Sequence, residues 1–245
     1  VIVSYQFNAG GAVLNEVLTD ETGNSLISIQ TGTIIAAIFI IAYTMLAGLV
    51  SVAYTDVANG IIIIFSFVIA IPIFLAQAGG FSGMAASFEA MGKPEHMNFF
   101  GVYSTMDIIN FCLPPFLLIM GDANMYQRFF ASKNAKGAEQ ATKVLIFAVL
   151  LAELMIIFSA WVASSMIPDA EVGKYVLIYA AHKLLPTFLG AIMMTTIVGI
   201  IISTADSYLL VPATTLMRDV YLNYINPKAD EKKIVFLSRM LVLGL

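Results

Sequence analysis

Residues 188–211 read FLGAIMMTTIVGIIISTADSYLLV, an apolar stretch that is long enough to cross a membrane as one helix. A transmembrane helix needs about 20 consecutive apolar residues. Four of the five residues at 203–207 nonetheless carry side-chain oxygens, and no Lys or Arg lies on the stretch to neutralise Asp206. An ionisable residue inside a membrane is costly and therefore indicates a functional site. The missing counter-charge is most simply a bound cation.

The composition of the whole chain excludes a soluble domain. Of the 245 residues 60% are hydrophobic and 11% are charged, and the mean hydropathy is +0.90. Soluble domains typically contain about 25% charged residues, so we expect an all-α, polytopic transmembrane helical bundle in a lipid bilayer. The net charge of −4 argues against a nucleic-acid partner, and the single cysteine, Cys112, excludes an internal disulfide.

Hydrophobic segments predict seven membrane spans in one transport domain. The five full-length and two partial spans lie at 31–50, 55–77, 103–127, 141–166 and 187–210, and at 1–14 and 234–245. The chain starts without Met and stops within a hydrophobic run, so we interpret it as a fragment truncated at both ends.

Basic residues predict the orientation of the spans, because Lys and Arg stay on the cytoplasmic side of a membrane. The segments 128–143 and 211–233 each hold four of them, whereas the alternate loops hold few. We therefore expect both segments to be cytoplasmic, in a bacterial-type plasma (inner) membrane. Asp56 then lies at the cytoplasmic start of the third span and Asp206 near the cytoplasmic end of the sixth, at similar depth.

Helical spacing arranges the oxygens of residues 203–207 on two faces. Ser203, Asp206 and Ser207 share one face at i, i+3 and i+4, and Thr204 points about a quarter turn away. Hard cations such as sodium favour oxygen ligands, so the two faces suit two adjacent cation sites. Alternatives stay open: the hydroxyls can bond to i−4 carbonyls or join helices. Asp206 or Asp56 can be a boundary charge that reaches water.

The fourth span contains Leu113-Pro114-Pro115-Phe116, followed by Gly121-Asp122. Paired prolines remove backbone donors and break a helix. Discontinuous helices near the bilayer midplane are the elements with which secondary transporters build their sites. A simple proline kink is the alternative.

Four blocks of sequence, taken together, resemble the sodium:solute symporter family. They occur in the family's order and cover nearly the whole chain. The blocks are Ser4-Tyr5-Gln6-Phe7 with Gly10-Gly11, Tyr43-Thr44 through Ala47-Gly48-Leu49 to Thr55-Asp56, Tyr126-Gln127-Arg128, and Ser203-Thr204-Ala205-Asp206-Ser207 leading to Met217-Arg218-Asp219-Val220-Tyr221. The resemblance implies the inverted-repeat, leucine-transporter-like fold, from about the third to the ninth core helix.

The resemblance also implies roles for the oxygens. The hydroxyls of Ser203 and Thr204 and the carbonyl of Ile200 match half of the family's shared sodium site. Some members have a second sodium site, which here would comprise Asp56, Ser203, Asp206 and Ser207. Asp206 is a carboxylate where the family pattern has a hydroxyl, so the chain could bind two sodium ions, or one sodium ion plus a proton.

The function implied is that of a sodium-coupled symporter, not an enzyme, which moves a small organic solute by alternating access. The solute would be a sugar, an amino acid or a carboxylate, and the implied contacts in the broken helix are Phe111, Pro114, Pro115, Asp122 and Asn124. A non-transporting sensor or channel of the same fold is the alternative. An intramembrane aspartyl hydrolase is disfavoured, because the approach to Asp122 lacks the first Gly of a Gly-x-Gly-Asp motif. The sequence does not assign an oligomeric state.

Overall fold

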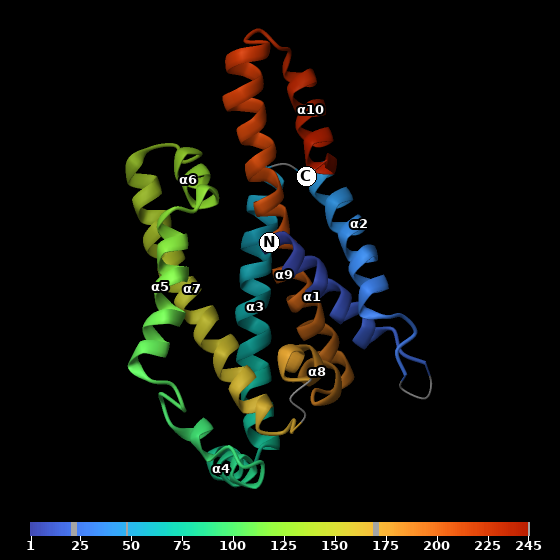
Figure 1. Ribbon diagram of the computed structural model, residues 1–245, viewed down its shortest axis with the longest axis vertical. Coiled ribbons are helices and arrows are strands. Elements are labelled where there is room, and N and C mark those ends of the chain that lie inside the picture. The colour runs from blue at the N-terminus through green and yellow to red at the C-terminus, as the bar shows by residue number, and fades with distance from the viewer. Residues whose placement is uncertain (21–23, 48, 169–171, 245) are drawn as a thin grey trace. The chain divides into compact units, whose positions relative to one another are not determined.

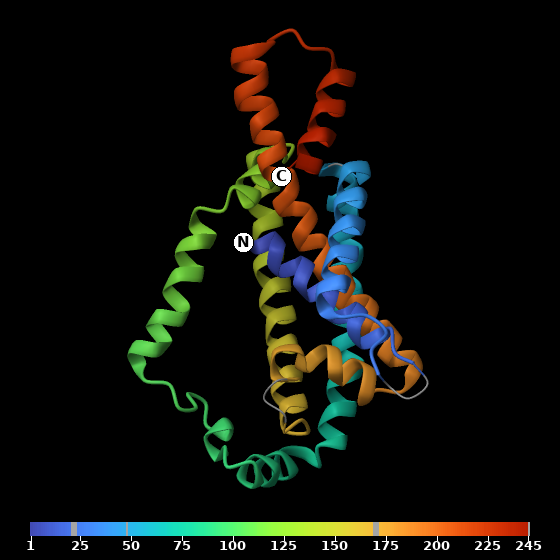
Figure 2. The same ribbon diagram turned by 45° about the vertical axis from the view of Figure 1, so that its right-hand side comes forward.

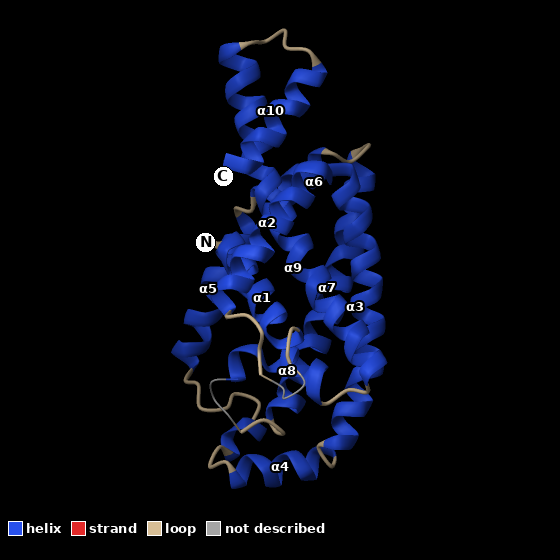
Figure 3. Cartoon of the chain, turned by 90° about the vertical axis from the view of Figure 1, so that its right-hand side faces the viewer, coloured by secondary structure: helices blue, strands red, loops and turns tan. Residues whose placement is uncertain are grey.

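Apolar runs form nearly all of the secondary structure. The structure, a computed structural model, describes residues 1–20, 24–47, 49–168 and 172–244, and these ranges are helical apart from loops and one isolated bridge, Thr19 to Ser25 (Figure 3). Five helices within them are long and apolar enough to cross a membrane: Ile29–Leu46, Ser51–Gln77, Thr105–Phe130, Ala135–Ser164 and Thr187–Ile225. The prediction of an all-helical membrane protein is therefore confirmed at this level.

The chain divides into two compact units, which are described separately: residues 1–63 with 194–245, and residues 64–193. Two long helices, α3 (Leu49–Gln77) and α9 (Thr187–Thr215), contribute residues to both units. Gly48, within the Ala47-Gly48-Leu49 motif, lies outside the described residues.

The first unit combines the first part of α3 and the second part of α9 with four further elements. In Figure 1, the end of α1 lies against the start of α2, and α10 turns back beside η3, the continuation of α9. The four elements are α1 (Ile2–Val17), α2 (Ile29–Ala47), the π-helix η3 (Leu216–Ile225) and α10 (Glu231–Gly244).

Glycines allow α1 and α2 to pack backbone against backbone. A Cβ atom added at Gly11 would lie 2.6 Å from the amide nitrogen of Thr33 and 2.7 Å from the carbonyl oxygen of Ile29. A Cβ atom at Gly32 would lie 2.7 Å from the carbonyl oxygen of Gly11. Small residues let membrane helices approach closely, so these positions fix how the hairpin packs. Asn15 closes its connection, since its Nδ2 donates to the Ile27 carbonyl at 2.7 Å.

The second unit contains α4 to α8, which follow one another in the sequence between α3 and α9. Figure 2 shows α4 running across the end of α3. Trp161 on α7 ties the loop after α4 in place, since its Nε1 donates to the His96 carbonyl at 2.8 Å. The elements are α4 (Gly80–Ala90), η1 (Pro94–Met97), α5 (Thr105–Met120), α6 (Ala123–Phe130), α7 (Ala135–Ser164), η2 (Val172–Tyr175) and α8 (Val176–Lys183).

The turn from α3 into α4 depends on two consecutive glycines. Gly79 and Gly80 have φ angles of +75° and +69°, in the left-handed region that costs other residues about 1–2 kcal/mol. We therefore expect Gly79→Ala to lower the free energy of unfolding by about that amount. Thermal unfolding of the purified full-length protein measures it, with Gly173→Ala as the control because a Cβ there meets no atom within 4 Å. Equal stability of the two variants would contradict the prediction.

The interruption of the fourth span differs in place from the prediction. Helix α5 runs through Pro114 and Pro115 to Met120, although each proline leaves one carbonyl of the preceding turn without its helical donor. The break falls at Gly121 and Asp122 instead. The Oδ1 atom of Asp122 accepts a hydrogen bond from the Asn124 amide at 3.0 Å, which caps α6 and starts a new helix.

The helix that carries Asp206 extends past residue 210, where the sequence predicted its end. It continues as η3, so that Asp206 lies midway between Thr187 and Ile225. The polar residues after Pro212 marked the end of the apolar run, but the backbone stays helical through them. Asp206 is 1% exposed, which removes the alternative of a boundary charge that reaches water.

Candidate cation site

One face of α9 brings the candidate oxygens against α2 and α3 within the first unit. Gly199, Ser203 and Asp206 follow one another at i, i+4 and i+7, which places them on the same side of a helix. Each of them forms a hydrogen bond with a residue more than a hundred positions earlier in the chain. Ser207, the neighbour of Asp206, is 6% exposed.

The first contact joins the two halves of the predicted second cation site. The Ser203 hydroxyl donates a hydrogen bond to Oδ1 of Asp56, which lies on α3 and is half-buried. Hydrogen bonds to an ionised group are shorter and stronger than those between neutral groups. The sequence assigned Asp56 and Asp206 to a similar depth only; the structure adds that Asp56 contacts Ser203, on the same helix as Asp206.

The second contact involves Thr44, a residue to which sequence reasoning gave no role of its own. Its hydroxyl lies against Oδ1 of Asp206 as a hydrogen-bond donor and also 2.8 Å from the Ile40 carbonyl. Thr44 is 1% exposed. The sequence did contain a sign of this role, namely a hydroxyl within the apolar run 31–50. Such a hydroxyl, however, more often bonds only to the backbone of its own helix.

The contacts described above leave one oxygen atom of the buried Asp206 carboxylate without a hydrogen bond. Its Oδ2 is buried and has no hydrogen-bond partner among the described residues. Burying a carboxylate oxygen without a partner is costly, and natural proteins rarely do so. This oxygen atom is therefore available to bind a ligand, and the negative charge of the carboxylate favours a cation.

Thr204 points to a different partner from Ser203, as the helical spacing predicts. Its hydroxyl donates a hydrogen bond to the Ile200 carbonyl at 2.9 Å. This is the bond to the i−4 carbonyl that the sequence analysis gave as the alternative to cation binding. The same bond holds together the two oxygens that the resemblance assigns to one sodium ion. A hydroxyl that donates its proton keeps its lone pairs for a cation.

The donor set suits an alkali ion better than a transition metal. No group of three or more His, Cys, Asp or Glu side chains gathers among the described residues. Hydroxyl, carbonyl and carboxylate oxygens are instead the ligands that hard cations prefer.

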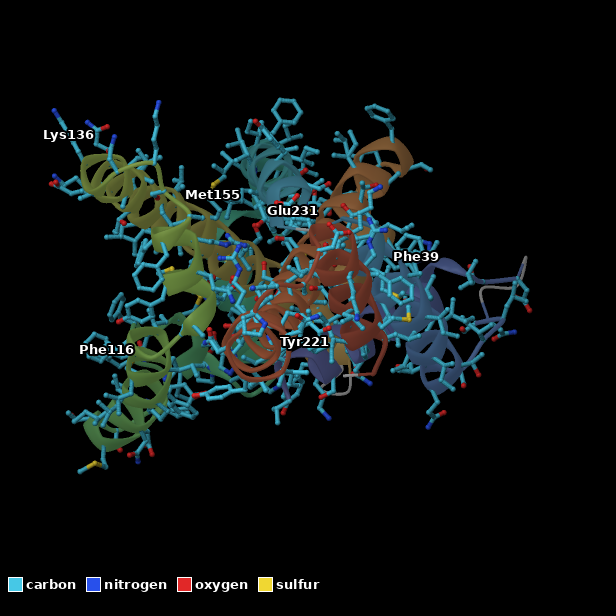
Figure 4. All side chains as sticks on the ribbon, turned by 90° about the horizontal axis from the view of Figure 1, so that it is seen from above. Phe39, Phe116, Lys136, Met155, Tyr221 and Glu231 are labelled. Atoms are coloured by element: carbon cyan, nitrogen blue, oxygen red, sulfur yellow. The ribbon has the colours of Figure 1, made fainter. Side chains whose placement is uncertain are left out.

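The candidate solute contacts lie in the second unit, on α5 and α6. Phe111 is 64% exposed and meets the ring of Tyr103 edge to face, with centroids 5.3 Å apart. Phe116, next to the proline pair, is also at the surface of α5 (Figure 4). The Asp122 side chain caps α6 by accepting a hydrogen bond from the backbone amide of Asn124, which gives Asp122 a structural role. A role in solute binding stays a prediction for these residues.

All of residues 1–245 match the sodium:solute symporter family. The chain belongs to the sodium:solute symporter family. This is a family of membrane transporters and not of enzymes, so the family expected from the four sequence blocks is confirmed.

Several relatives of the chain are named for the solute that they transport. The chain is 24% identical to the high-affinity proline transporter PutP of Bacillus subtilis over 99% of its own length and 50% of the relative's. It is 24% identical to the human high affinity choline transporter 1, over 96% of this chain and 41% of that one. It is 24% identical to the sodium/pantothenate symporter of Escherichia coli, over 88% and 45%. The chain thus spans about half the length of these relatives.

Proposed function

We propose that the full-length protein containing this chain is a sodium-coupled symporter that moves a small organic solute by alternating access. Family membership supports the coupling to sodium. The observation that carries it to these residues is the buried pair of contacts on α9, from Ser203 to Asp56 and from Thr44 to Asp206, with Oδ2 of Asp206 left without a partner.

Two sodium ions are proposed as co-substrates. The first would contact the hydroxyls of Ser203 and Thr204 and the carbonyl of Ile200, together with groups outside this chain. The second would lie between Asp56 and Asp206, with Ser203 and Ser207 as further ligands, where two carboxylates supply the charge that a buried cation requires. Coupling then follows if sodium binds more tightly to the state that accepts the solute, because a ligand shifts an equilibrium by its differential affinity.

The solute proposed is small and either charged or zwitterionic, since the relatives are named for proline, choline and pantothenate. Phe111, Pro114, Pro115, Asp122 and Asn124 are the proposed contacts within this chain. We propose an inverted-repeat fold, with 128–143 and 211–233 on the cytoplasmic side.

Uptake into proteoliposomes tests the function. The purified full-length protein is reconstituted, and entry of labelled proline, choline and pantothenate is compared under an inward sodium gradient and an equal potassium gradient. We expect at least one solute to enter only with sodium, and the rate to depend sigmoidally on sodium concentration because two ions bind. Equal uptake in both gradients would overturn the proposal.

Substitution of Thr204 tests the first ion site. Thr204→Ala removes one ligand oxygen, so we expect the sodium concentration for half-maximal uptake to rise about tenfold, which corresponds to about 1.4 kcal/mol. Thr204→Ser keeps the hydroxyl and should remain within about twofold of the wild type. Similar sodium dependence of the alanine and serine variants would show that the hydroxyl binds no sodium.

A further inference from the structure

A third contact on the same face of α9 is made by Asn59, to which neither the family resemblance nor the proposed sites give a role. Asn59 lies on α3, one helical turn after Asp56, and is half-buried. Its Nδ2 donates a hydrogen bond to the carbonyl oxygen of Gly199 at 3.3 Å, across 140 positions of sequence.

Gly199 provides the space in which the Asn59 side chain lies. A Cβ atom added at residue 199 would be 3.1 Å from Oδ1 and 3.3 Å from Cγ of Asn59. These separations are tighter than ordinary van der Waals contact, so an alanine would push the amide away by a few tenths of an ångström. Glycine weakens a helix interior relative to alanine, and its presence here therefore has a packing reason.

The contacts at Asp56 and Asn59 act as a pair. Asp56 contacts Ser203, and Asn59, one turn later on α3, contacts Gly199, one turn earlier on α9. One contact alone would let α9 pivot about it. Two contacts one turn apart fix both the rotation of α9 about its axis and its position along α3.

The proposed ligands of the first sodium ion follow directly after these two fixed residues. Ile200 comes after Gly199, and Thr204 comes after Ser203, on an adjacent face of the same turn. The carbonyl of Ile200 and the hydroxyl of Thr204 are therefore turned toward or away from an ion by any rotation of α9. A site works only when its ligands are held close to the productive geometry by their supporting contacts.

We propose that Asn59 is a positioning residue of the sodium site, which sets the rotation of α9 through its hydrogen bond to Gly199 and does not itself touch the ion. This proposal rests on the proposed function, in which Ile200, Ser203 and Thr204 bind sodium. It differs from a purely structural role because it predicts a loss of sodium affinity that is separate from any loss of stability.

The test is the thermal stabilisation of the purified full-length protein by sodium alone, titrated against potassium chloride at constant ionic strength. A ligand that binds only the folded state stabilises it by RT ln(1 + [ligand]/Kd), so the sodium concentration at which the melting temperature begins to rise reports the affinity, and no solute needs to be known. We expect Asn59→Leu to raise the apparent dissociation constant for sodium, fitted from the rise of the melting temperature with sodium concentration, by about three- to tenfold, the factor that one hydrogen bond represents. Gly199→Ala should raise it in the same direction.

Three further variants make the result specific. Asn59→Gln keeps the amide donor and should restore the response to within about twofold. The double variant of Asn59→Leu and Gly199→Ala should lose no more than the larger single effect, because both remove one contact. Gly60→Ala is the matched control, since a Cβ at this next residue of α3 meets no atom within 4 Å.

The outcomes separate the two proposals. Absence of sodium stabilisation in the wild type would overturn the proposed function, and this inference with it. A wild-type response that Asn59→Leu and Gly199→Ala leave unchanged, with only the melting temperature in potassium lowered, would overturn the positioning role alone. If Asn59→Leu does not fold, Gly199→Ala decides the matter by itself.

Discussion

Asp56→Ala in the full-length protein is expected to raise the sodium concentration for half-maximal uptake by at least about tenfold, the largest functional effect in this chain. The substitution removes the carboxylate that accepts the hydrogen bond of the Ser203 hydroxyl, which is also one of two carboxylates facing the proposed second ion. Hydrogen bonds to charged groups contribute about 1.5–3 kcal/mol, so the loss corresponds to roughly ten- to a hundredfold. Initial uptake rates over a sodium series measure it.

Asp56→Asn separates charge from hydrogen bonding in this experiment. The amide oxygen can still accept from Ser203, but the negative charge is gone, so we expect nearly the effect of alanine if a cation binds there. Glu231→Ala is the control, because this exposed carboxylate lies in the first turn of α10 (Figure 4). Wild-type sodium dependence of the asparagine variant would contradict a second sodium ion at Asp56.

Gly11→Ala is expected to have the largest effect on stability. The new Cβ would meet backbone atoms of Thr33 and Ile29 at 2.6 and 2.7 Å, where no flexible side chain can move aside. Overpacking of this kind typically costs about 1–3 kcal/mol, and a backbone clash belongs at the upper end of that range. The melting temperature of the purified full-length protein and the fraction that elutes as a single species measure the loss.

Gly60→Ala tells this clash apart from a general effect of adding a methyl group to a membrane helix. Its Cβ meets nothing within 4 Å, and alanine favours a helix more than glycine does, so its stability should equal or exceed that of the wild type. Equal melting temperatures for the two variants would show that α1 and α2 do not pack as tightly as described.

The sequence predicts the helices well because hydrophobicity over some twenty residues is a local property. It also singles out Asp56, Ser203 and Asp206, because oxygens within apolar runs are conspicuous. It does not predict Thr44, because a lone threonine in a helix is usually satisfied by its own backbone. The contact from Thr44 to Asp206 joins residues 162 positions apart. The hydrophobic periodicity of a sequence does not indicate which helices pack against each other.

Helix ends are the other difference between sequence and structure. The proline pair at 114–115 is a strong local indication of a helix break, yet the helix ends only at Gly121. There the side chain of Asp122 accepts a backbone hydrogen bond and starts the next helix. The polar residues after 211 predict an end to the sixth span, whereas the helix widens into a π-helix and continues to Ile225. Both ends depend on backbone hydrogen bonds that composition does not reveal.

The partnership of Asp56 with Ser203 also has a consequence for biosynthesis. The two residues are 147 positions apart, so at about 5–20 residues per second the ribosome makes Ser203 roughly 7–30 s after Asp56. During that time α3 must enter the bilayer, or wait beside the translocon, with its carboxylate not yet joined to α9. Release of α3 into lipid is therefore expected to be delayed until α9 emerges, and shortening the nascent chain before residue 203 should leave α3 within reach of crosslinkers placed in the translocon.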